Sequence, residues 1–258
     1  MINRKGEKSV NNEGYLMEII EYKNAHDMII QFLDNHKAII RCKKYNDFKY
    51  GKIKNPYHPK VFNIGFIGQG NYKSRENKQL ENSYRLWENM LQRCYDPYYI
   101  NKHPTYKDCA VCEEWHNFQN FAKWYEENYY EVKDEIMCLD KDILIKGNEI
   151  YSPSTCIFVP KRINLLFVKN DLVRGEYPIG VCLNKNRQRL LSGCNVLINN
   201  KKKHINLGYF NINEPFKAFT CYKIFKEKYI KEVADEYKDL IPIKLYEALY
   251  KYEVEIND

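Results

Sequence analysis

Apolar and polar residues alternate in three short stretches near the start of the chain. Such alternation predicts half-buried strands, because successive side chains of a strand point to opposite faces. Turn residues lie between the stretches, at Asn24 and at Asp34–Asn35. Residues 1–59 are therefore predicted to form a small antiparallel β unit, with strands at Leu16–Glu21, Met28–Phe32 and Ala38–Cys42.

Residues 60–79 contain glycines and show no strong periodicity, and we interpret them as a connector. After this stretch, apolar residues recur at helical spacing. Ser83 stands where a helix N-cap is expected. Two sets of apolar residues then recur at helical spacing: Tyr84, Trp87, Met90 and Leu91, and after them Trp115, Phe118, Phe121, Ala122 and Trp124. We interpret both sets as the core residues of two helices.

The segment 80–168 ends on a strand, a polar loop, a second strand and the start of a helix. The apolar pieces Ile136–Leu139 and Cys156–Val159 are the two predicted strands, and the helix is expected to begin after Pro160. Gly147 lies in the loop between the strands. The order strand, strand, helix is therefore predicted for this part of the chain.

The segment 174–258 predicts an antiparallel sheet packed on a helix. Its strands are Ile179–Leu183, Gln188–Leu191 and Ile205–Phe210, with turns at Asn184–Asn186 and Asn199–Lys203. Pro215 opens a long helix, and Pro242 interrupts it before a last short helix over Leu245–Tyr250. One apolar stripe of the long helix consists of Phe216, Phe219, Ile224, Tyr229 and Val233. The fold class predicted for the whole chain is α+β.

Composition narrows the class of protein. The chain has 258 residues, 44% of them hydrophobic and 29% charged, which is typical of a globular protein. No apolar run is long enough to span a membrane, and residues 1–12 lack the apolar core of a signal peptide. Nine cysteines are scattered without a pairing pattern, which favours free thiols or metal ligands over disulfides. A cytoplasmic location is the expectation.

The net charge of +7 is concentrated in one stretch. Between residues 174 and 204 only Glu176 opposes seven cations, which are Arg174, Lys185, Arg187, Arg189, Lys201, Lys202 and Lys203. Arg187 and Arg189 are two residues apart and are expected to share one face of a strand, where arginine can contact phosphates or guanine edges. A second group of lysines is either a solvated face or an accessory nucleic-acid contact: Lys43, Lys44, Lys49, Lys52 and Lys54.

Three pieces of the C-terminal segment, YPIGV, LGYF and EPFKAF, resemble the DNA-binding domain of the APETALA type. In that family three antiparallel strands backed by a helix read DNA through the sheet. The resemblance covers about residues 174–235 and rests on Gly180, Val181, Leu207, Gly208, Phe210 and Ala218. Leu190 or Leu191 stands where the family usually has a tryptophan. The resemblance implies that double-stranded DNA is the partner.

Three blocks of the middle segment occur in a distinctive order: YRLWENMLQRCYDP, DCAVCEEWHNFQNFAKW and CLDKDILIKGNEIYSPSTCIFVPKRIN. Together they resemble phage-encoded HNH endonucleases of the homing type, many of which carry an APETALA-type domain behind the nuclease. The resemblance implies a central ββα-metal segment with flanking helices, which cuts DNA with Mg²⁺ or Mn²⁺ in the cytoplasm of a bacterial cell.

The resemblance assigns roles to four residues. Asp140 lies where the family has its metal-binding acid, and Thr155 lies where it has a metal-binding asparagine. Lys141 stands in place of the general-base histidine, and Asn164 matches the last asparagine of the motif. A lysine with its ordinary pKa of about 10.4 is protonated at neutral pH and cannot accept a proton. His103 and His116 are the nearest histidines in sequence, and neither is a clear replacement.

Cys109 and Cys112 form a C-x-x-C pair that would supply half of a structural zinc site. The alternative interpretation is that both are small buried residues beside the helix that carries Trp115. Three functions remain open from the sequence: a metal-dependent DNA endonuclease, a nuclease-derived DNA-binding protein without catalysis, and a phage inhibitor of a host defence that targets nucleic acids.

Overall fold

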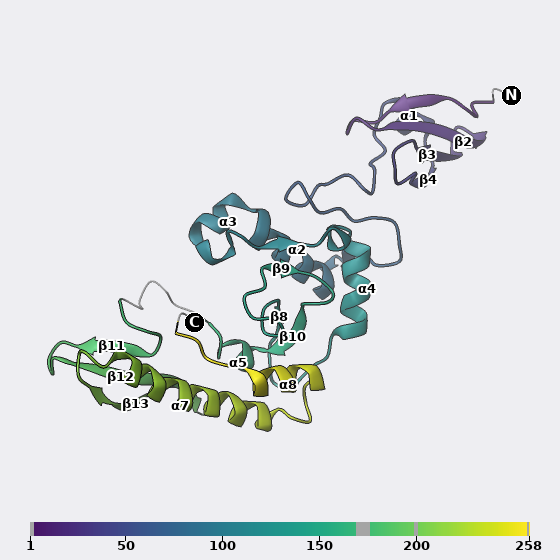
Figure 1. Ribbon diagram of the computed structural model, residues 1–258. Helices are drawn as coiled ribbons and strands as arrows, with labels where there is room; N and C mark the ends of the chain where they lie inside the picture. Colours follow the sequence, from purple (N-terminus) through teal and green to yellow (C-terminus); the bar gives the residue numbers. More distant parts are fainter. Residues whose placement is uncertain (1–2, 169–175, 199–200, 257) are drawn as a thin grey trace. The chain divides into compact units, whose positions relative to one another are not determined.

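The computed structural model is a mixed α+β structure with several small sheets (Figure 1). It describes residues 3–168, 176–198, 201–256 and 258. The chain divides into two compact units: unit 1 comprises Met1–Asn128 and Glu149–Pro153, and unit 2 comprises Tyr129–Asn148 and Ser154–Asp258. Residues from the predicted segment 80–168 therefore contribute to both units. In the described part of the chain, no helix combines the length and the apolar character needed to cross a membrane.

Unit 1 begins with an antiparallel meander of four strands in sequential order, which confirms the predicted β unit. The strands are β1 (Lys8–Val10), β2 (Leu16–Asn24), β3 (Asp27–Phe32) and β4 (Ile39–Cys42), and α1 (Tyr45–Lys49) follows. Alternate side chains such as Met17, Ile19 and Ile30 are buried against Phe48 of α1. The edge strand β1 was not predicted, because Lys8-Ser9-Val10 is too short and polar to show alternation.

Residues 60–79 are ordered although they lack periodicity. They contain a two-residue hairpin of β5 (Arg75–Glu76) and β6 (Gln79–Leu80). Before the hairpin, the Gln119 side chain donates hydrogen bonds to the carbonyl oxygens of Ile67 and Tyr72 at 3.1 and 2.9 Å. Side-chain to backbone bonds of this kind leave no hydrophobic signature, so the connector interpretation missed the local order.

The remainder of unit 1 is helical around an aromatic core. Its elements are α2 (Asn82–Tyr95), α3 (Pro97–Lys102), η1 (Pro104–Tyr106), β7 (Ala110–Val111), η2 (Glu113–His116), α4 (Phe118–Asn128) and β9 (Ile150–Tyr151). Trp87, Trp115 and Phe121 are fully buried, and the Trp87 indole donates to Trp115 O, which confirms the core interpretation. Ser83 lies inside α2 and is not its cap, because Glu81 occupies the N-cap position.

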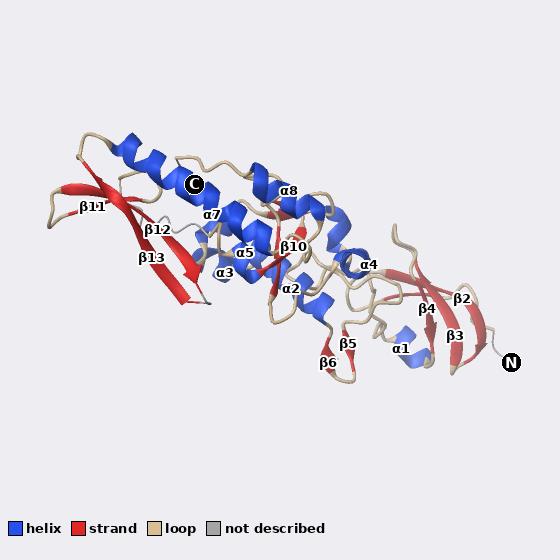
Figure 2. Cartoon of the chain, turned by 90° about the horizontal axis from the view of Figure 1, so that it is seen from below, coloured by secondary structure: helices blue, strands red, loops and turns tan. Residues whose placement is uncertain are grey.

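Unit 2 combines a strand pair, a three-stranded sheet and two longer helices (Figure 2). Its elements are β8 (Met137–Asp140), β10 (Ile157–Pro160), α5 (Lys161–Asn164), β11 (Val181–Asn184), β12 (Arg189–Ile198), β13 (Lys201–Phe210), α7 (Pro215–Glu236) and α8 (Ile243–Lys251). The main hydrophobic core includes Ile157, Ile163, Val196, Ile230 and Leu245, and a second, smaller cluster is formed by Val181, Leu190 and Ala218.

The three-stranded sheet is longer than predicted. β12 continues from the predicted Gln188–Leu191 to Ile198, and β13 begins at Lys201, so the expected turn at Asn199–Lys203 is wrong for its three lysines. Ser192 and Gly193 look like turn residues, but the Ser192 hydroxyl is buried and donates to Ala218 O of α7 at 2.8 Å. A satisfied hydroxyl can lie in a core at little cost.

Helix α7 buries only part of the predicted stripe, since Val233 is buried and Phe219 and Tyr229 pack half-buried against the core. Phe216 and Ile224 are 69% and 64% exposed. The buried residues of the helix are Ala218, Tyr222, Ile230, Val233 and Ala234. Close packing on a sheet selects the face with a small residue, and the Tyr222 ring fills the space where Gly180, at φ 75°, has no side chain. The helix ends at Glu236, and Pro242 is the N-cap of α8.

Candidate functional site

The sheet β11–β13 has one face against α7 and one face away from it. On β12 the side chains of Leu190, Ser192, Cys194 and Val196 are buried, so the alternate residues point away from α7. We name that side the outer face. Its polar and charged side chains come from both long strands and from the turn before β12, and they include Arg187, Arg189, Asn195, Lys202, His204, Asn206 and Tyr209.

Arg187 and Arg189 lie on the outer face for different structural reasons. Arg189 is the first residue of β12 and lies opposite Asn184. Arg187 belongs to the turn before β12, so the predicted sharing of one strand face is wrong. Its guanidinium lies over the Tyr209 ring, 4.4 Å from the centroid, and Tyr209 is opposite Leu191 on the outer face. Stacking on the ring therefore brings Arg187 to the same side as Arg189.

The three consecutive lysines of β13 do not share a face. Lys202 is opposite Leu197 and lies on the outer face, whereas Lys203 is opposite the buried Val196 and lies on the α7 side. Lys201 has the same parity as Lys203. Lys185 lies in the turn before β12, where its carbonyl accepts a hydrogen bond from the Gln188 side chain. Arg174 lies outside the described residues.

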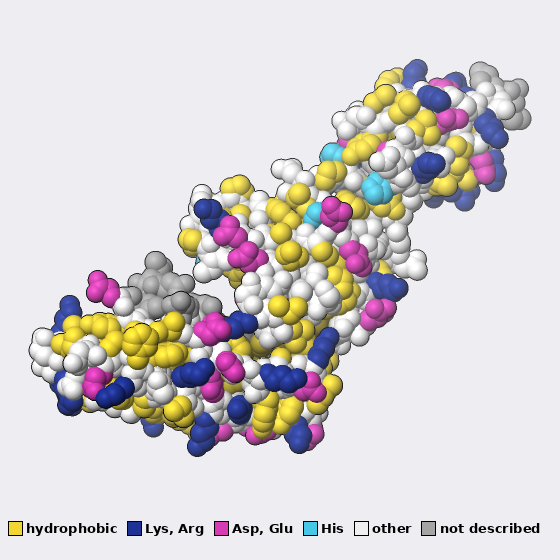
Figure 3. Space-filling view, viewed as in Figure 1, with side chains coloured by type: hydrophobic (Ala, Val, Ile, Leu, Met, Phe, Trp, Pro, Cys, Tyr) yellow, Lys and Arg dark blue, Asp and Glu magenta, His cyan; other side chains and the backbone are white. Residues whose placement is uncertain are grey.

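The cations of the outer face are exposed. Among the described residues, Arg187, Arg189 and Lys202 form no ion pair. On the side of unit 2 that Figure 3 draws, in contrast, lysine and arginine side chains are interspersed with aspartate and glutamate. The basic surface is therefore defined by the cations that the strand register places on the outer face. The net charge of the chain does not define it.

A second candidate site lies on the strand pair of β8 and β10. The strands are antiparallel, Asp140 at the end of β8 is opposite Ile157, and α5 follows β10 directly. Asp140 Oδ1 accepts backbone N–H bonds from Asp142 and Ile143 at 3.0 and 2.8 Å, which fixes the turn after the strand. Burial and the nearby Asp142 carboxylate raise the pKa of Asp140 to about 6, against the effect of the two N–H groups.

Lys141 is held in a structural role. Its side chain is 13% exposed, and its ammonium donates to Asn148 O at 2.9 Å and pairs with Asp142 at 3.3 Å. The Asn148 amide donates in return to Lys141 O at 2.7 Å. These bonds close the loop between Lys141 and Asn148 and engage the Lys141 side chain in structural contacts.

The other two residues assigned by the resemblance lie at different ends of the strand pair. Thr155 precedes Ile157 by two residues and therefore lies at the end where Asp140 is found. Asn164 is the last residue of α5, whose single turn starts from Pro160, opposite Met137 at the other end. The structure thus brings Asp140 and Thr155 to one end of the strands, while Asn164 approaches from the opposite end.

The donor set around Asp140 is suitable for a hard cation but small. Mg²⁺ takes oxygen ligands and is often bound by one or two carboxylates together with water. Asp140 and the exposed Asp142 supply carboxylates, and Thr155 supplies a hydroxyl near the same strand end. Within the described ranges, no group of three or more His, Cys, Asp or Glu side chains converges on a point where a metal ion could be held.

The C-x-x-C pair lies in unit 1 on either side of β7. Cys109 is buried, and its thiol donates to Thr105 O at 3.8 Å. Burial raises the pKa of Cys112, which opposes the thiolate form that zinc requires. His116 makes a hydrogen bond with Val111 O at 3.1 Å. A structural zinc stays a prediction that these contacts do not support.

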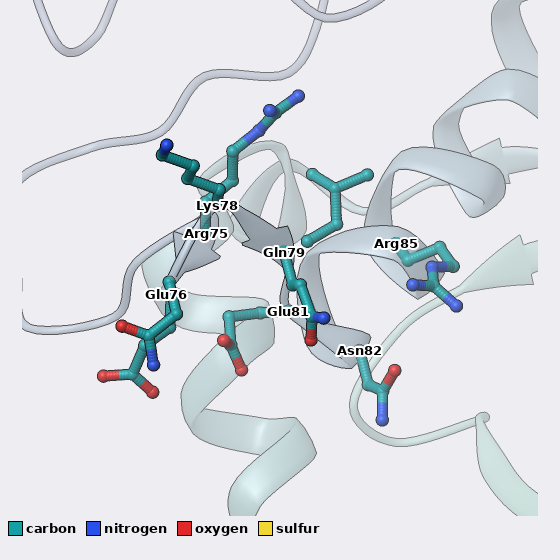
Figure 4. Close-up of a pocket in the computed structure, with 9 residues that line it drawn as sticks. Arg75, Glu76, Lys78, Gln79, Glu81, Asn82 and Arg85 are labelled. Atoms are coloured by element: carbon teal, nitrogen blue, oxygen red, sulfur yellow. The ribbon is translucent and has the colours of Figure 1, made fainter.

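A pocket in unit 1 lies beside the hairpin β5–β6 and the start of α2 (Figure 4). Arg75 and Lys78 extend to one side of the hairpin, and Glu76 and Glu81 to the other. Charges of both signs line the pocket, and no nucleophile is paired there with a base. We assign no chemistry to it.

Searches against models of protein families, against curated proteins and against solved structures found no match for this chain.

Proposed function

We propose that the chain binds double-stranded DNA through the outer face of the sheet β11–β13. The observation that supports this is that Arg187, Arg189 and Lys202 lie on one face, at the two ends of β12, while α7 covers the other face. A twisted antiparallel sheet fits the major groove, where arginine contacts phosphates and guanine edges. Cations without carboxylate partners release counterions from DNA on binding, which supplies affinity.

The stack of Arg187 on Tyr209 strengthens this proposal. A guanidinium held over a ring at 4.4 Å loses little conformational entropy when it binds. Phosphate oxygens accept the paired donors of a guanidinium well. Tyr209 therefore acts as a positioning residue for Arg187.

The test is the affinity and the salt dependence of duplex binding, measured by fluorescence anisotropy. Arg187→Ala with Arg189→Ala should lower the affinity at least about tenfold and reduce the log–log salt slope by about two, since each phosphate contact contributes about 0.9. Lys231→Ala with Lys244→Ala removes two exposed cations of α7 and α8 that form none of the described ion pairs, and it serves as the matched control. If both double variants lose the same duplex affinity, binding is non-specific attraction between the positive charges of the protein and DNA, and the outer face is not the binding surface.

A second candidate function is metal-dependent DNA cleavage at Asp140. The order of β8, β10 and α5, with a carboxylate at the end of the first strand and Thr155 beside it, is what favours this candidate. A bound Mg²⁺ would stabilise the leaving oxygen of the phosphodiester. The base cannot be Lys141 in the arrangement described, because its ammonium is bonded to Asn148 O and Asp142.

Plasmid nicking with Mg²⁺ or Mn²⁺ tests the cleavage candidate. Asp140→Ala should abolish nicking and leave duplex binding unchanged, whereas Asp239→Ala, an exposed carboxylate elsewhere in unit 2, should nick like the wild type. Lys141→His introduces an imidazole with a pKa of about 6.5 and should raise nicking at neutral pH. If neither the wild type nor Lys141→His nicks any duplex, a binding protein without catalysis replaces the endonuclease.

A further inference from the structure

A cross-strand hydrogen bond joins two exposed polar side chains of the outer face. Asn195 of β12 and His204 of β13 are direct partners in the strand ladder, and His204 Nδ1 lies 3.1 Å from Asn195 Oδ1. Both side chains are exposed and lie on the face away from α7. Neither contributes to the core of unit 2, so both are accessible to a ligand on this face.

The hydrogen bond fixes which atoms of the pair remain available. An amide oxygen only accepts, so Nδ1 of His204 is the donor and carries the proton. In a neutral imidazole Nε2 is then an acceptor. The Asn195 amide has its oxygen engaged and keeps two N–H donors. The pair therefore presents one donor and one acceptor side by side.

Gly193 gives the imidazole its place on the sheet. A Cβ at residue 193 would lie 2.5 Å from His204 Nε2 and 2.6 Å from its Cε1, so the ring edge occupies the space that any other side chain would need. The strand register shifts between Ser192 and Gly193, directly beside this contact. The ring is thus seated over the backbone of β12 and held by Asn195, which leaves it little rotamer freedom to lose on binding.

We propose that Asn195 and His204 act together as one base-reading unit for adenine in the major groove. Adenine presents an acceptor at N7 and a donor at N6, the complement of the Asn195 amide donor and His204 Nε2. This inference rests on the proposed binding of duplex DNA. In this proposal the cations Arg189 and Lys202 supply affinity. The uncharged pair between them, Asn195 and His204, supplies sequence preference.

Protonation of His204 changes what the pair can read. With Nε2 protonated, both groups donate, and guanine with its acceptors O6 and N7 becomes the better partner. The side chains that face the imidazole are those of Asn195 on β12 and Lys202 on its own strand; β13 is the edge of the sheet, and α7 lies on the other face.

The experiment is selection of bound sequences from a randomised duplex library with the full chain at pH 8.0 and pH 5.5. At pH 8.0 the wild type should enrich adenine about tenfold at one position, and Asn195→Ala and His204→Ala should each lose that preference at the same position. At pH 5.5 the wild type should shift that position towards guanine. His204→Gln keeps an acceptor that does not titrate, so it should prefer adenine at both pH values.

Lys202→Ala is the matched control on the same face. Loss of a phosphate contact should weaken binding to all library members alike and leave the base preference unchanged. A wild type that binds duplexes without any base preference, or whose preference survives in both Asn195→Ala and His204→Ala, overturns the base-reading unit and leaves DNA binding standing. A wild type that binds no duplex overturns both proposals.

Discussion

The sheets β1–β4 and β11–β13 both carry exposed lysines and arginines, but among the described residues only the first sheet pairs them with carboxylates across its strands. Lys8 and Glu18 are direct ladder partners with charged atoms 3.5 Å apart. Arg41 donates two hydrogen bonds to the carboxylate of Asp27, each 2.9 Å long. On the outer face of the second sheet, the partner of Lys202 is Leu197.

The difference bears on what each surface can bind. A cation that already has a carboxylate partner adds little to the attraction of a polyanion, because the pair presents no net charge. The first sheet is therefore expected to contribute little to DNA binding in spite of its lysines. The group Lys43, Lys44, Lys49, Lys52 and Lys54 is exposed beyond that sheet and stays a predicted accessory contact.

We expect the largest loss of duplex affinity when carboxylate side chains, which the first sheet has, are introduced into the second sheet. Leu191→Glu with Leu197→Glu places carboxylates on the outer face, directly opposite Tyr209 and Lys202. We expect duplex affinity to fall about a hundredfold at low salt, because the new charges neutralise cations and repel phosphates. Fluorescence anisotropy measures the change.

The control for this variant is Leu191→Gln with Leu197→Gln, which has the same shape without the charge. It should keep affinity within a few fold of the wild type. If the glutamine variant loses as much affinity as the glutamate variant, the leucines themselves contact DNA and the charge argument fails.

A smaller effect is expected at Asp140, whose carboxylate is half-buried and lacks a cation of its own because the Lys141 ammonium is bonded to Asp142. Its pKa of about 6 lies above the ordinary 3.8, so the folded state favours the neutral form. The charge therefore costs stability above pH 6, and no cost is present below pH 3.8. Asp140→Asn keeps the acceptor for the turn and should add about 1–2 kcal/mol to the free energy of unfolding at pH 7.5.

Urea unfolding followed by circular dichroism measures this change. The three tryptophans all lie in unit 1, so their fluorescence does not report on Asp140. The gain should disappear at pH 3.5, where the wild-type carboxyl is protonated in both states. A gain of equal size at pH 3.5 would show that the amide improves packing and that the charge is not the cause.

The sequence correctly predicted elements in which buried residues recur at a regular period. It missed elements whose position depends on contacts with residues distant in the sequence. The alternation in Met28–Phe32 led directly to β3. The lysines at the start of β13 carry no alternation of polarity, so they resembled a turn although they are paired with Val196, Leu197 and Ile198. Whether a lysine lies on the outer face or on the α7 side is decided by strand register, which the local sequence does not encode.

The candidate site shows the same limit. Asp140 could be assigned from the resemblance, but the bonds that hold Lys141 to Asn148 depend on a loop that closes seven residues later. The pair of Asn195 and His204 was not predicted, since the two residues meet only because β12 and β13 have a fixed register. Arg187 was assigned to the correct face for the wrong reason, because its contact with Tyr209 replaces strand alternation.

The smallest expected effect comes from releasing cations in the first sheet. Asp27→Asn removes the carboxylate that binds Arg41 and lies 3.8 Å from Lys23. The two freed cations should raise low-salt affinity for duplex DNA about two- to threefold.

The hydrogen bond from Arg41 holds the pKa of Asp27 below its ordinary value, so the ion pair stabilises the fold at neutral pH and is lost as pH falls through that lowered pKa. The variant should therefore be slightly less stable than the wild type at pH 7 and equally stable once Asp27 is protonated.

Asp239→Asn is the matched control for this last variant, since it removes one exposed negative charge in unit 2 and none of the described ion pairs includes Asp239. Anisotropy titrations at two salt concentrations separate the two explanations. If pairing governs the first sheet, only Asp27→Asn gains affinity, and the gain vanishes at high salt because the freed cations are screened. If Asp239→Asn gains as much, net charge alone sets the affinity, and the contrast between the paired and the unpaired sheet has no bearing on DNA binding.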